Sequence, residues 1–232
     1  MDRTGPESST ATAVTVAMLA GREPERRFRG RNVSKADVSI YDLGGRRVAV
    51  KDYGARPFLV RQTLGRWMVR RETKAYRAAD GASGIAAYLG RVGSFAFATV
   101  CLDAIPLADV PAGTVGAETF DRLDRILSGL HAHGVAIADL HHRDVLIGAG
   151  GDVHVVDFAA AYVLGANPSG FRRRVFARLS AQDRLAAARM RARFTGRPED
   201  EALAQMDPVA VRLWGVGRKI KALWDRFRLR RA

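Results

Sequence analysis

Gly-Val-Ala-Ile-Ala-Asp-Leu-His-His-Arg-Asp-Val-Leu-Ile-Gly-Ala-Gly-Gly-Asp-Val-His-Val-Val-Asp-Phe, residues 134–158, is the stretch from which the fold is interpreted. Val145 to Ile147 is a short apolar run that predicts a strand, and the glycine-rich segment 148–151 predicts a turn. Apolar residues surround one histidine in Val153 to Val156, which predicts a second strand. The pattern therefore predicts a β-hairpin.

Three carboxylates flank this hairpin. Asp139 and Asp144 bracket the polar loop before the first strand, and Asp157 follows the second strand. Because a hairpin brings the end of the loop close to the end of the second strand, the three side chains can gather at one place. Carboxylate oxygens are the ligands that Mg²⁺ prefers in proteins. The sequence therefore predicts that the three acids gather around a divalent metal ion.

The same residues resemble the catalytic loop and the metal-binding loop of the protein-kinase-like superfamily. The matching pattern is Asp139-Leu-His, then Asp144-Val-Leu-Ile, then a turn and Val-Val-Asp157-Phe. It is most similar to the lean bacterial branch: lipopolysaccharide (Kdo) kinases, RIO-type kinases and sugar or antibiotic phosphotransferases. The resemblance implies that Asp139 is the catalytic base and that Asp144 and Asp157 are magnesium ligands, with Asp144 in a position that asparagine usually holds.

A lysine and a glutamate upstream extend this resemblance. Val48-Ala49-Val50-Lys51 resembles the kinase strand whose lysine pairs with the nucleotide phosphates. Glu72 is the only acid between Asp52 and Asp80, and the resemblance implies that it holds Lys51 in an ion pair. The implied nucleotide-binding residues are thus Lys51, Glu72 and Asp157, and the implied cofactors are ATP and Mg²⁺.

The resemblance implies an α+β, two-lobed protein-kinase-like fold. The small lobe would be antiparallel β with one main helix, and the large lobe would be mostly helical. We expect a partly disordered N-terminal extension over residues 1–30, the small lobe over 31–106, and the large lobe, with basic C-terminal helices, over 107–232. A reduced activation segment is expected, because no Ala-Pro-Glu follows Asp157.

Hydrophobic periodicity and glycine positions predict the remaining elements. Leu102 to Pro106 is expected to be the hinge between the lobes. The other expected segments are a linker at Gly21–Asn32, a helix at Pro57–Ala79 broken near Gly65, strands at Ile85–Leu89 and Phe95–Leu102, helices at Phe120–His133 and Val175–Phe194, a linker at Pro198–Asp207, and a basic amphipathic segment at Val209–Arg231.

Charge is unevenly distributed along the 232 residues. The net charge is +14, and residues 171–232 carry 17 Lys and Arg against 6 Asp and Glu. A basic end of this kind favours phosphate-bearing partners such as anionic lipid, lipopolysaccharide or nucleic acid. The alternative is a merely solvated basic surface. A hydrophobic content of 47% excludes a disordered chain and is typical of a globular one.

The sequence carries little sign of export or of membrane insertion. The single Cys101 has no internal partner for a disulfide, as is common in reducing compartments. No apolar run approaches the roughly 18 residues of a spanning helix. The segment before Ala11 contains Asp2, Arg3 and Glu7, so it lacks the positive excess of a signal peptide. We expect a cytoplasmic protein, and peripheral association with the inner face of the cytoplasmic membrane stays open.

Together these features predict an ATP-dependent kinase that transfers a phosphoryl group to a hydroxyl. The expected acceptor is a sugar of lipopolysaccharide or of another envelope component, because a reduced activation segment leaves no platform for a peptide. Two alternatives remain: a RIO-like serine/threonine protein kinase acting near RNA, and a catalytically weak pseudokinase serving as a basic module on membrane or nucleic acid.

Overall fold

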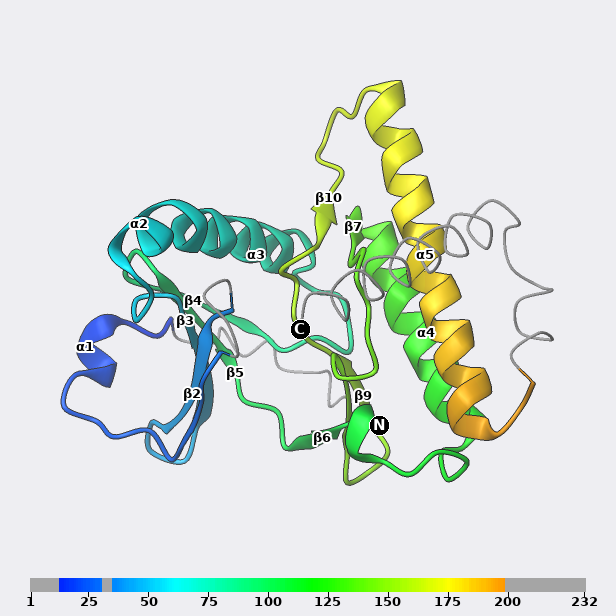
Figure 1. Cartoon of the computed structure of the whole chain (residues 1–232), viewed down its shortest axis with the longest axis horizontal. Coiled ribbons are helices and arrows are strands. Elements are labelled where there is room, and N and C mark those ends of the chain that lie inside the picture. The colour runs from blue at the N-terminus through cyan, green and yellow to red at the C-terminus, as the bar shows by residue number, and fades with distance from the viewer. Residues whose placement is uncertain (1–12, 31–34, 199–232) are drawn as a thin grey trace, which may run out of the picture. The chain divides into compact units, whose positions relative to one another are not determined.

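The computed structural model describes residues 13–30 and 35–198. These residues form an α+β structure of antiparallel sheets and several helices (Figure 1). Among the described residues, no helix is both long and apolar enough to cross a bilayer. The basic segment expected at 209–231 lies outside the described residues, as does nearly all of the linker expected before it.

The chain divides into two compact units. Unit 1 is Met1–Asp80 with Ala86–Leu102, and unit 2 is Gly81–Ile85 with Asp103–Ala232. The division after Leu102 falls at the start of the segment expected to be a hinge. Residues 81–85 cross to unit 2, because Ile85 forms a parallel bridge with Val155 and the amide of Val155 donates to the carbonyl of Gly84 over 2.8 Å.

Unit 1 is built on one antiparallel sheet in the order β1-β2-β3-β5-β4 (Figure 1). The expected strand at 85–89 starts later in the structure, at Tyr88. The bounds are β1 Arg26–Phe28, β2 Asp37–Asp42, β3 Arg47–Asp52, β4 Tyr88–Val92 and β5 Ala96–Val100, preceded by the short helix α1 Val16–Leu19.

Residues before position 31 are part of this unit, so the expectation of an N-terminal extension and a linker is wrong for residues 14–28. Val14 is 1% exposed, and its amide donates to the carbonyl of Leu89 over 2.7 Å. β1 pairs with β2, with Arg27 opposite Ser39. All three residues of β1 are exposed, so the alternation that reveals a half-buried strand is missing from the sequence.

The two faces of the sheet bury different side chains, because successive residues of a strand point to opposite faces. Val48 and Val50 of β3 join Val14 and Leu89 in a buried apolar cluster on one face. Lys51 lies on the other face, opposite Phe97 of β5.

The Lys51 face is covered by a helical segment in three parts. These are α2 Phe58–Val60, the π-helix η1 Arg61–Gly65 and α3 Arg66–Ala78. The aromatic ring of Tyr76 on α3 lies 5.7 Å from that of Phe97. The break predicted near Gly65 is the wider turn of the π-helix η1. Gly65 packs closely on Tyr53, since an added Cβ would lie 3.0 Å from the Cβ of Tyr53.

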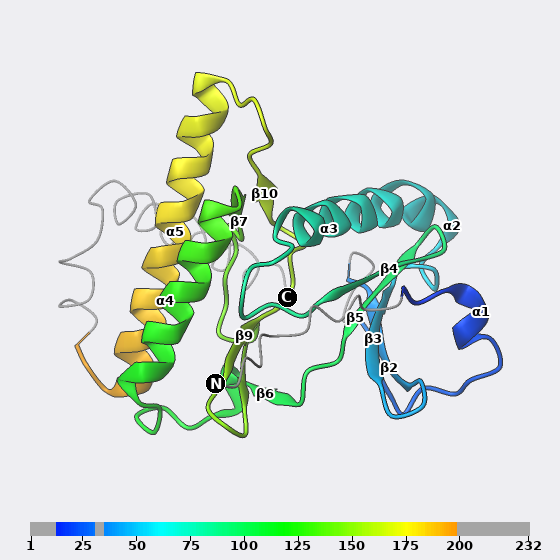
Figure 2. The same cartoon turned by 180° about the vertical axis from the view of Figure 1, so that it is seen from behind.

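Unit 2 is organised by two long helices that lie side by side in both views (Figures 1 and 2). They are α4 Ala117–Ala132 and α5 Gly170–Thr195. The side chain of Ser169 caps α5, and Gly196 ends it in the left-handed conformation with φ +73°. The apolar face of α4 is buried as its periodicity predicts, through Phe120, Leu123, Ile126, Leu127 and Leu130.

Short strands precede α4 and connect it to α5. The predicted hairpin is present, as β8 Val145–Gly148 and β9 Val153–Val155, and β8 also pairs with β6 Ala104–Pro106. A second small sheet joins β7 Val135–Ala136 to β10 Tyr162–Val163. One turn of 3-10 helix, η2, spans Leu107–Asp109. The strands hold the loop 137–144 by both of its ends.

Candidate functional site

Lys51 and Glu72 form a close ion pair within unit 1. The Nζ atom of Lys51 donates to Oε2 of Glu72 over 2.7 Å, which is the pairing expected from the sequence. The side chain of Glu72 is 0% exposed and that of Lys51 is 18% exposed. Tyr53 donates its hydroxyl to the other carboxylate oxygen of Glu72 over 3.1 Å. β3 and α3 thus fix the ammonium group in one place.

The Lys51 ammonium is fixed in position and partly exposed. Its carboxylate partner is buried, and breaking a buried pair is costly, so its position is well defined. The partial exposure of Lys51 leaves the group accessible. A fixed and partly accessible ammonium of this kind can neutralise phosphate charge.

Asp139 lies in unit 2, in the loop between β7 and β8, and its side chain is 68% exposed. Nε2 of His141 lies 3.2 Å from Oδ1 of Asp139. This contact can orient the Asp139 carboxylate. An exposed carboxylate with one oriented oxygen can accept a proton from a bound hydroxyl group.

Asp144 and Asp157 form a coupled pair of carboxylates in the same unit. Burial first, and then the charge of Asp157, raise the pKa of Asp144 to about 6. The amide of His141 donates to Oδ2 of Asp144 over 3.0 Å, and this hydrogen bond acts in the opposite direction. Oδ1 of Asp157 accepts from the amide of Ala159 over 3.1 Å. Two negative charges are therefore held close together.

Backbone strain marks the same two segments. Among the described residues, the non-glycine residues with positive φ are Ala138, at +67°, and Asp157, at +69°. This left-handed region is unfavourable for residues that carry a Cβ, and it persists only where the surroundings impose it. One of the two precedes Asp139, and the other is a candidate metal ligand.

A further acid supports the strained loop, and the sequence analysis did not identify it. Asp183 of α5 is 1% exposed, and its carboxylate accepts from the amides of Ile137 and Ala138, each over 2.8 Å. Nε2 of His131 on α4 lies 3.0 Å from the same carboxylate. The available signal was that Asp183 is the only acid in the arginine-rich α5. Its two amide partners lie 45 and 46 residues away and are backbone groups, which have no sequence signature.

The expectation that three carboxylates gather around one metal ion is not met. In the described part of the chain, no group of three or more His, Cys, Asp and Glu is arranged to hold a metal. Asp139 contributes only the smallest of the effects on the pKa of Asp144. The pair Asp144 and Asp157 still fits Mg²⁺, because this ion usually takes one or two carboxylates and completes its shell with water and phosphate oxygens.

The structure therefore brings the predicted residues together in two groups. Lys51 and Glu72 form one in unit 1, and Asp144 and Asp157 form the other in unit 2, with the exposed Asp139 on the same loop as Asp144. Neither the comparison with protein-family models nor the search among curated proteins finds a match for this chain.

Proposed function

We propose that this protein is an ATP-dependent phosphotransferase and that its two units are the lobes of a protein-kinase-like fold. The observation that carries the proposal is the Asp144–Asp157 pair. Burial and the nearby charge of Asp157 raise the pKa of Asp144 to about 6, and a bound cation would stabilise the two carboxylates in their charged form. Asp157 is also held in a strained backbone conformation. The Lys51–Glu72 ion pair adds the phosphate-binding group that such an enzyme needs.

Each group then has its own role. Lys51, fixed by Glu72, binds the phosphates, and Asp144 and Asp157 hold Mg²⁺, which neutralises phosphate charge when bound. Asp139 accepts the proton of the acceptor hydroxyl while the oxygen of that hydroxyl forms a bond to the γ-phosphorus. The bond between that phosphorus and the β,γ-bridging oxygen breaks, and ADP leaves with the electron pair. Asp183 and His131 keep the loop in place.

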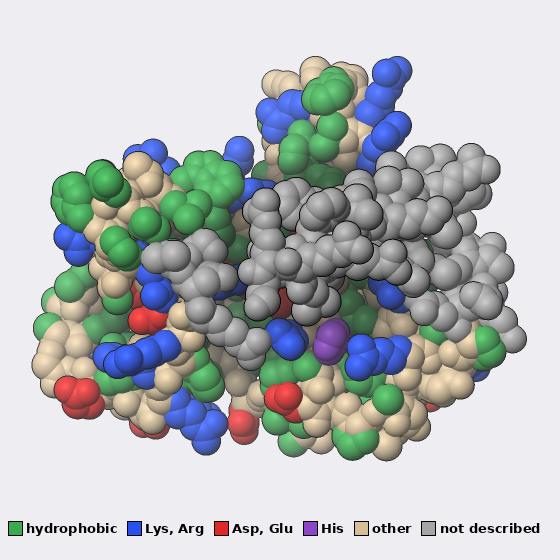
Figure 3. Space-filling model, in the orientation of Figure 1, with side chains coloured by type: hydrophobic (Ala, Val, Ile, Leu, Met, Phe, Trp, Pro, Cys, Tyr) green, Lys and Arg blue, Asp and Glu red, His purple; other side chains and the backbone are tan. Residues whose placement is uncertain are grey.

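The acceptor that we propose is a sugar hydroxyl of lipopolysaccharide or of another envelope component. Support comes from the short connection between Asp157 and α5, which begins at Gly170. It comes also from the exposed cationic start of α5, where Phe171 is 75% exposed. Figure 3 shows Lys and Arg side chains along both sides of the N-terminal half of α5. An anionic surface on the inner face of the cytoplasmic membrane would attract this region.

The test combines labelled ATP with cell-envelope extract. The wild-type chain should transfer label to the lipid-linked fraction in the presence of Mg²⁺. Asp139→Ala should lower the rate by roughly 10²-fold or more while leaving Mg-ATP binding intact, because general-base catalysis contributes at that scale. Asp152→Ala is the matched control, since it removes an exposed carboxylate of the same unit, at the hairpin turn.

The opposite results are equally clear. The enzyme proposal would be wrong if phosphoryl transfer survived Asp139→Ala, or if the wild-type chain did not bind Mg-ATP. Either result would favour the alternative of a basic pseudokinase module. Label found on a protein in ribosomal fractions, rather than on lipid, would favour the RIO-like alternative.

A further inference from the structure

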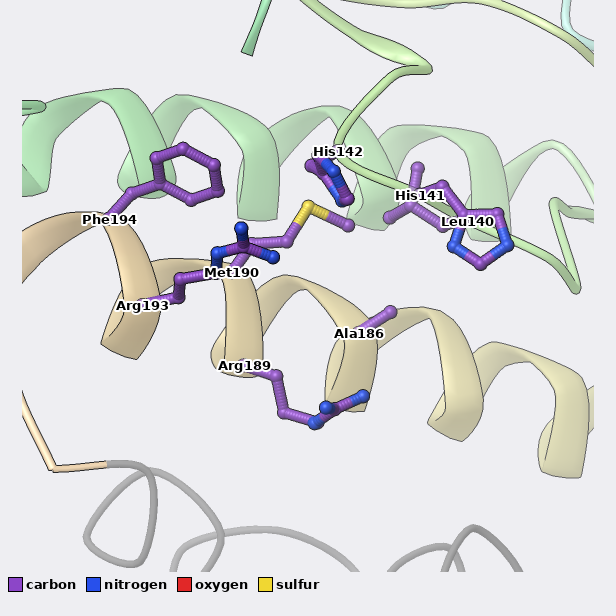
Figure 4. A pocket seen from close by; sticks show the side chains of 8 residues that line it. All are labelled: Leu140, His141, His142, Ala186, Arg189, Met190, Arg193 and Phe194. Atoms are coloured by element: carbon purple, nitrogen blue, oxygen red, sulfur yellow. The ribbon is translucent and has the colours of Figure 1, made fainter. Parts of the chain in front are cut away.

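A small pocket lies in unit 2 between the loop that carries Asp139 and the C-terminal half of α5 (Figure 4). Its volume is about 100 Å³. Figure 4 shows that the side chains lining it come from two elements. The loop supplies Leu140, His141 and His142, and α5 supplies Ala186, Arg189, Met190, Arg193 and Phe194.

The pocket combines an apolar floor with cationic walls. Leu140, Met190 and Phe194 are buried. Arg189 and Arg193 are always charged, whereas no acid is among the described residues that line the pocket. The Arg193 guanidinium lies near the His142 ring, because its charge is, after burial, among the causes that lower the pKa of His142. The Arg193 guanidinium and the His142 ring can both donate hydrogen bonds to an anion that binds beside them.

The pocket is also next to the proposed catalytic base. Leu140 directly follows Asp139, and Nε2 of His141 is 3.2 Å from the Asp139 carboxylate. A group held in the pocket therefore lies beside the residue that would accept a proton. The Lys51 ammonium belongs to the other unit and plays no part in this pocket.

The size of the pocket limits what it can hold. A water molecule takes about 30 Å³ of liquid volume, and ordinary small-molecule sites measure roughly 300 Å³ or more. A volume of about 100 Å³ suits one oxyanion rather than a nucleotide or a whole sugar. Arginine binds phosphate and carboxylate groups in a two-pronged geometry, which makes both groups suitable.

We propose that this pocket binds a phosphate or carboxylate group of the acceptor, so that the acceptor is an anionic hydroxyl compound whose charge sits on α5 and whose hydroxyl faces Asp139. The acceptor role rests on the proposed phosphotransferase function, whereas the binding of an oxyanion by Arg193 and His142 does not.

The experiment titrates the full chain with inorganic phosphate, and separately with acetate, at constant ionic strength set by sodium chloride. The ring signals of His142 are followed by NMR. Saturable changes with either anion are the expected result, and the two arms distinguish a phosphate from a carboxylate preference. Arg193→Gln should weaken binding about tenfold or more, because a hydrogen bond to a charged group contributes at that scale.

Arg178→Gln is the matched control. Arg178 is an exposed arginine on the same helix, about three turns from Arg189, and its replacement should leave the affinity unchanged. If Arg193→Gln disturbs the fold, which its own spectrum would reveal, Arg193→Lys provides the second variant, because it keeps the charge and loses the two-pronged geometry. No saturable change at His142, or equal affinity in the Arg178 and pocket variants, would overturn the inference.

Two further measurements separate this inference from the proposed function. Lys74→Met, at an exposed site of unit 1, should leave phosphate binding in the pocket unchanged, because Lys74 does not line it; a lost signal in that variant would count against the pocket. If the chain transfers phosphate from Mg-ATP but binds neither phosphate nor acetate in the pocket, only the inference about the pocket is wrong. Anion binding without any transfer overturns the enzyme and supports only an oxyanion site.

Discussion

Glu72 and Asp183 are the charged side chains that the described part of the chain buries most completely, at 0% and 1% exposure. Each holds a residue or segment that the proposed chemistry uses. Glu72 fixes the ammonium of Lys51, and Asp183 fixes the backbone of Ile137 and Ala138. Burying a carboxylate is costly unless cations or amides compensate it, so both acids make their partners hard to move.

Replacement of Lys51 by Met should destabilise the fold. It removes the ammonium 2.7 Å from the buried Glu72 carboxylate, and losing one partner of a buried pair costs about 3–5 kcal/mol. Urea unfolding would measure this loss. Adding Glu72→Gln should recover part of it, whereas Lys74→Met, at an exposed site on α3, should have almost no effect. A cost below about 1 kcal/mol for Lys51→Met would show that the ion pair contributes little.

Replacement of Asp144 by Asn should stabilise the protein above pH 6. The pKa of Asp144 is raised to about 6 from an ordinary value of 3.8. The proton therefore stabilises the fold fully below pH 3.8, and this contribution is lost as the pH rises through about 6. An asparagine oxygen can still accept from the amide of His141.

At pH 7.5 the Asp144→Asn variant should be more stable than the wild type by roughly 1–3 kcal/mol, and the difference should shrink toward pH 4. Urea unfolding measured across this pH range gives the comparison, with Asp152→Asn as the control at an exposed acid. A difference that does not change with pH would mean that Asp144 is not held in a raised-pKa environment.

At the scale of elements, short connections position the candidate site more than the long helices do. The segment 81–85 follows α3 in sequence and yet belongs to unit 2, where it lies beside β9 and against α4. Gly84 makes this possible. Its φ is +75°, and an added Cβ would lie 2.3 Å from Cδ1 of Ile126. Ile126 is part of the buried face of α4, so it has little room to shift.

Gly84→Ala should therefore destabilise the protein by about 2–4 kcal/mol, since backbone strain and overpacking act together. Gly81→Ala is the matched control. Its φ is +82°, but nothing lies within 4 Å of an added Cβ, so only the backbone strain of about 1 kcal/mol remains. Thermal or urea unfolding measures both. Equal losses in the two variants would show that Ile126 yields easily.

At the scale of the whole molecule, the excess positive charge is the dominant property. The chain carries 38 Lys and Arg against 24 Asp and Glu. In the described residues, one concentration lies at the start of α5, where Arg172, Arg173 and Arg174 follow the exposed Phe171 and no acid lies in the first turn. Basic residues next to an exposed aromatic ring are typical of proteins that bind anionic membrane surfaces.

The full chain should therefore co-sediment with anionic phospholipid vesicles and not with neutral ones, and binding should weaken as salt is added. Phe171→Ser combined with Arg174→Gln should reduce binding about tenfold, since each surface charge contributes about 1 kcal/mol and the ring adds apolar contact. Arg91→Gln, an exposed site on β4, is the control. Co-sedimentation with RNA but not with vesicles would favour the RIO-like alternative.

The sequence alone was sufficient for the local elements. Alternation and glycine positions predicted the hairpin β8–β9, apolar periodicity predicted α4, and the break near Gly65 was found as a π-helical turn. The Lys51–Glu72 contact was also expected, from a resemblance rather than from periodicity. These features could be predicted because each depends on residues within one turn or one hairpin, or on a recognisable motif.

Only the tertiary structure decided the rest. β1 was missed because a fully exposed edge strand has no alternation, and Asp183 was missed because it binds backbone amides 45 and 46 residues away. The raised pKa of Asp144 depends on burial and on the distance to Asp157, and neither can be read from residue order. The sequence by itself thus determined the local elements and the candidate residues, whereas long-range packing determined which of these residues are buried, paired or exposed.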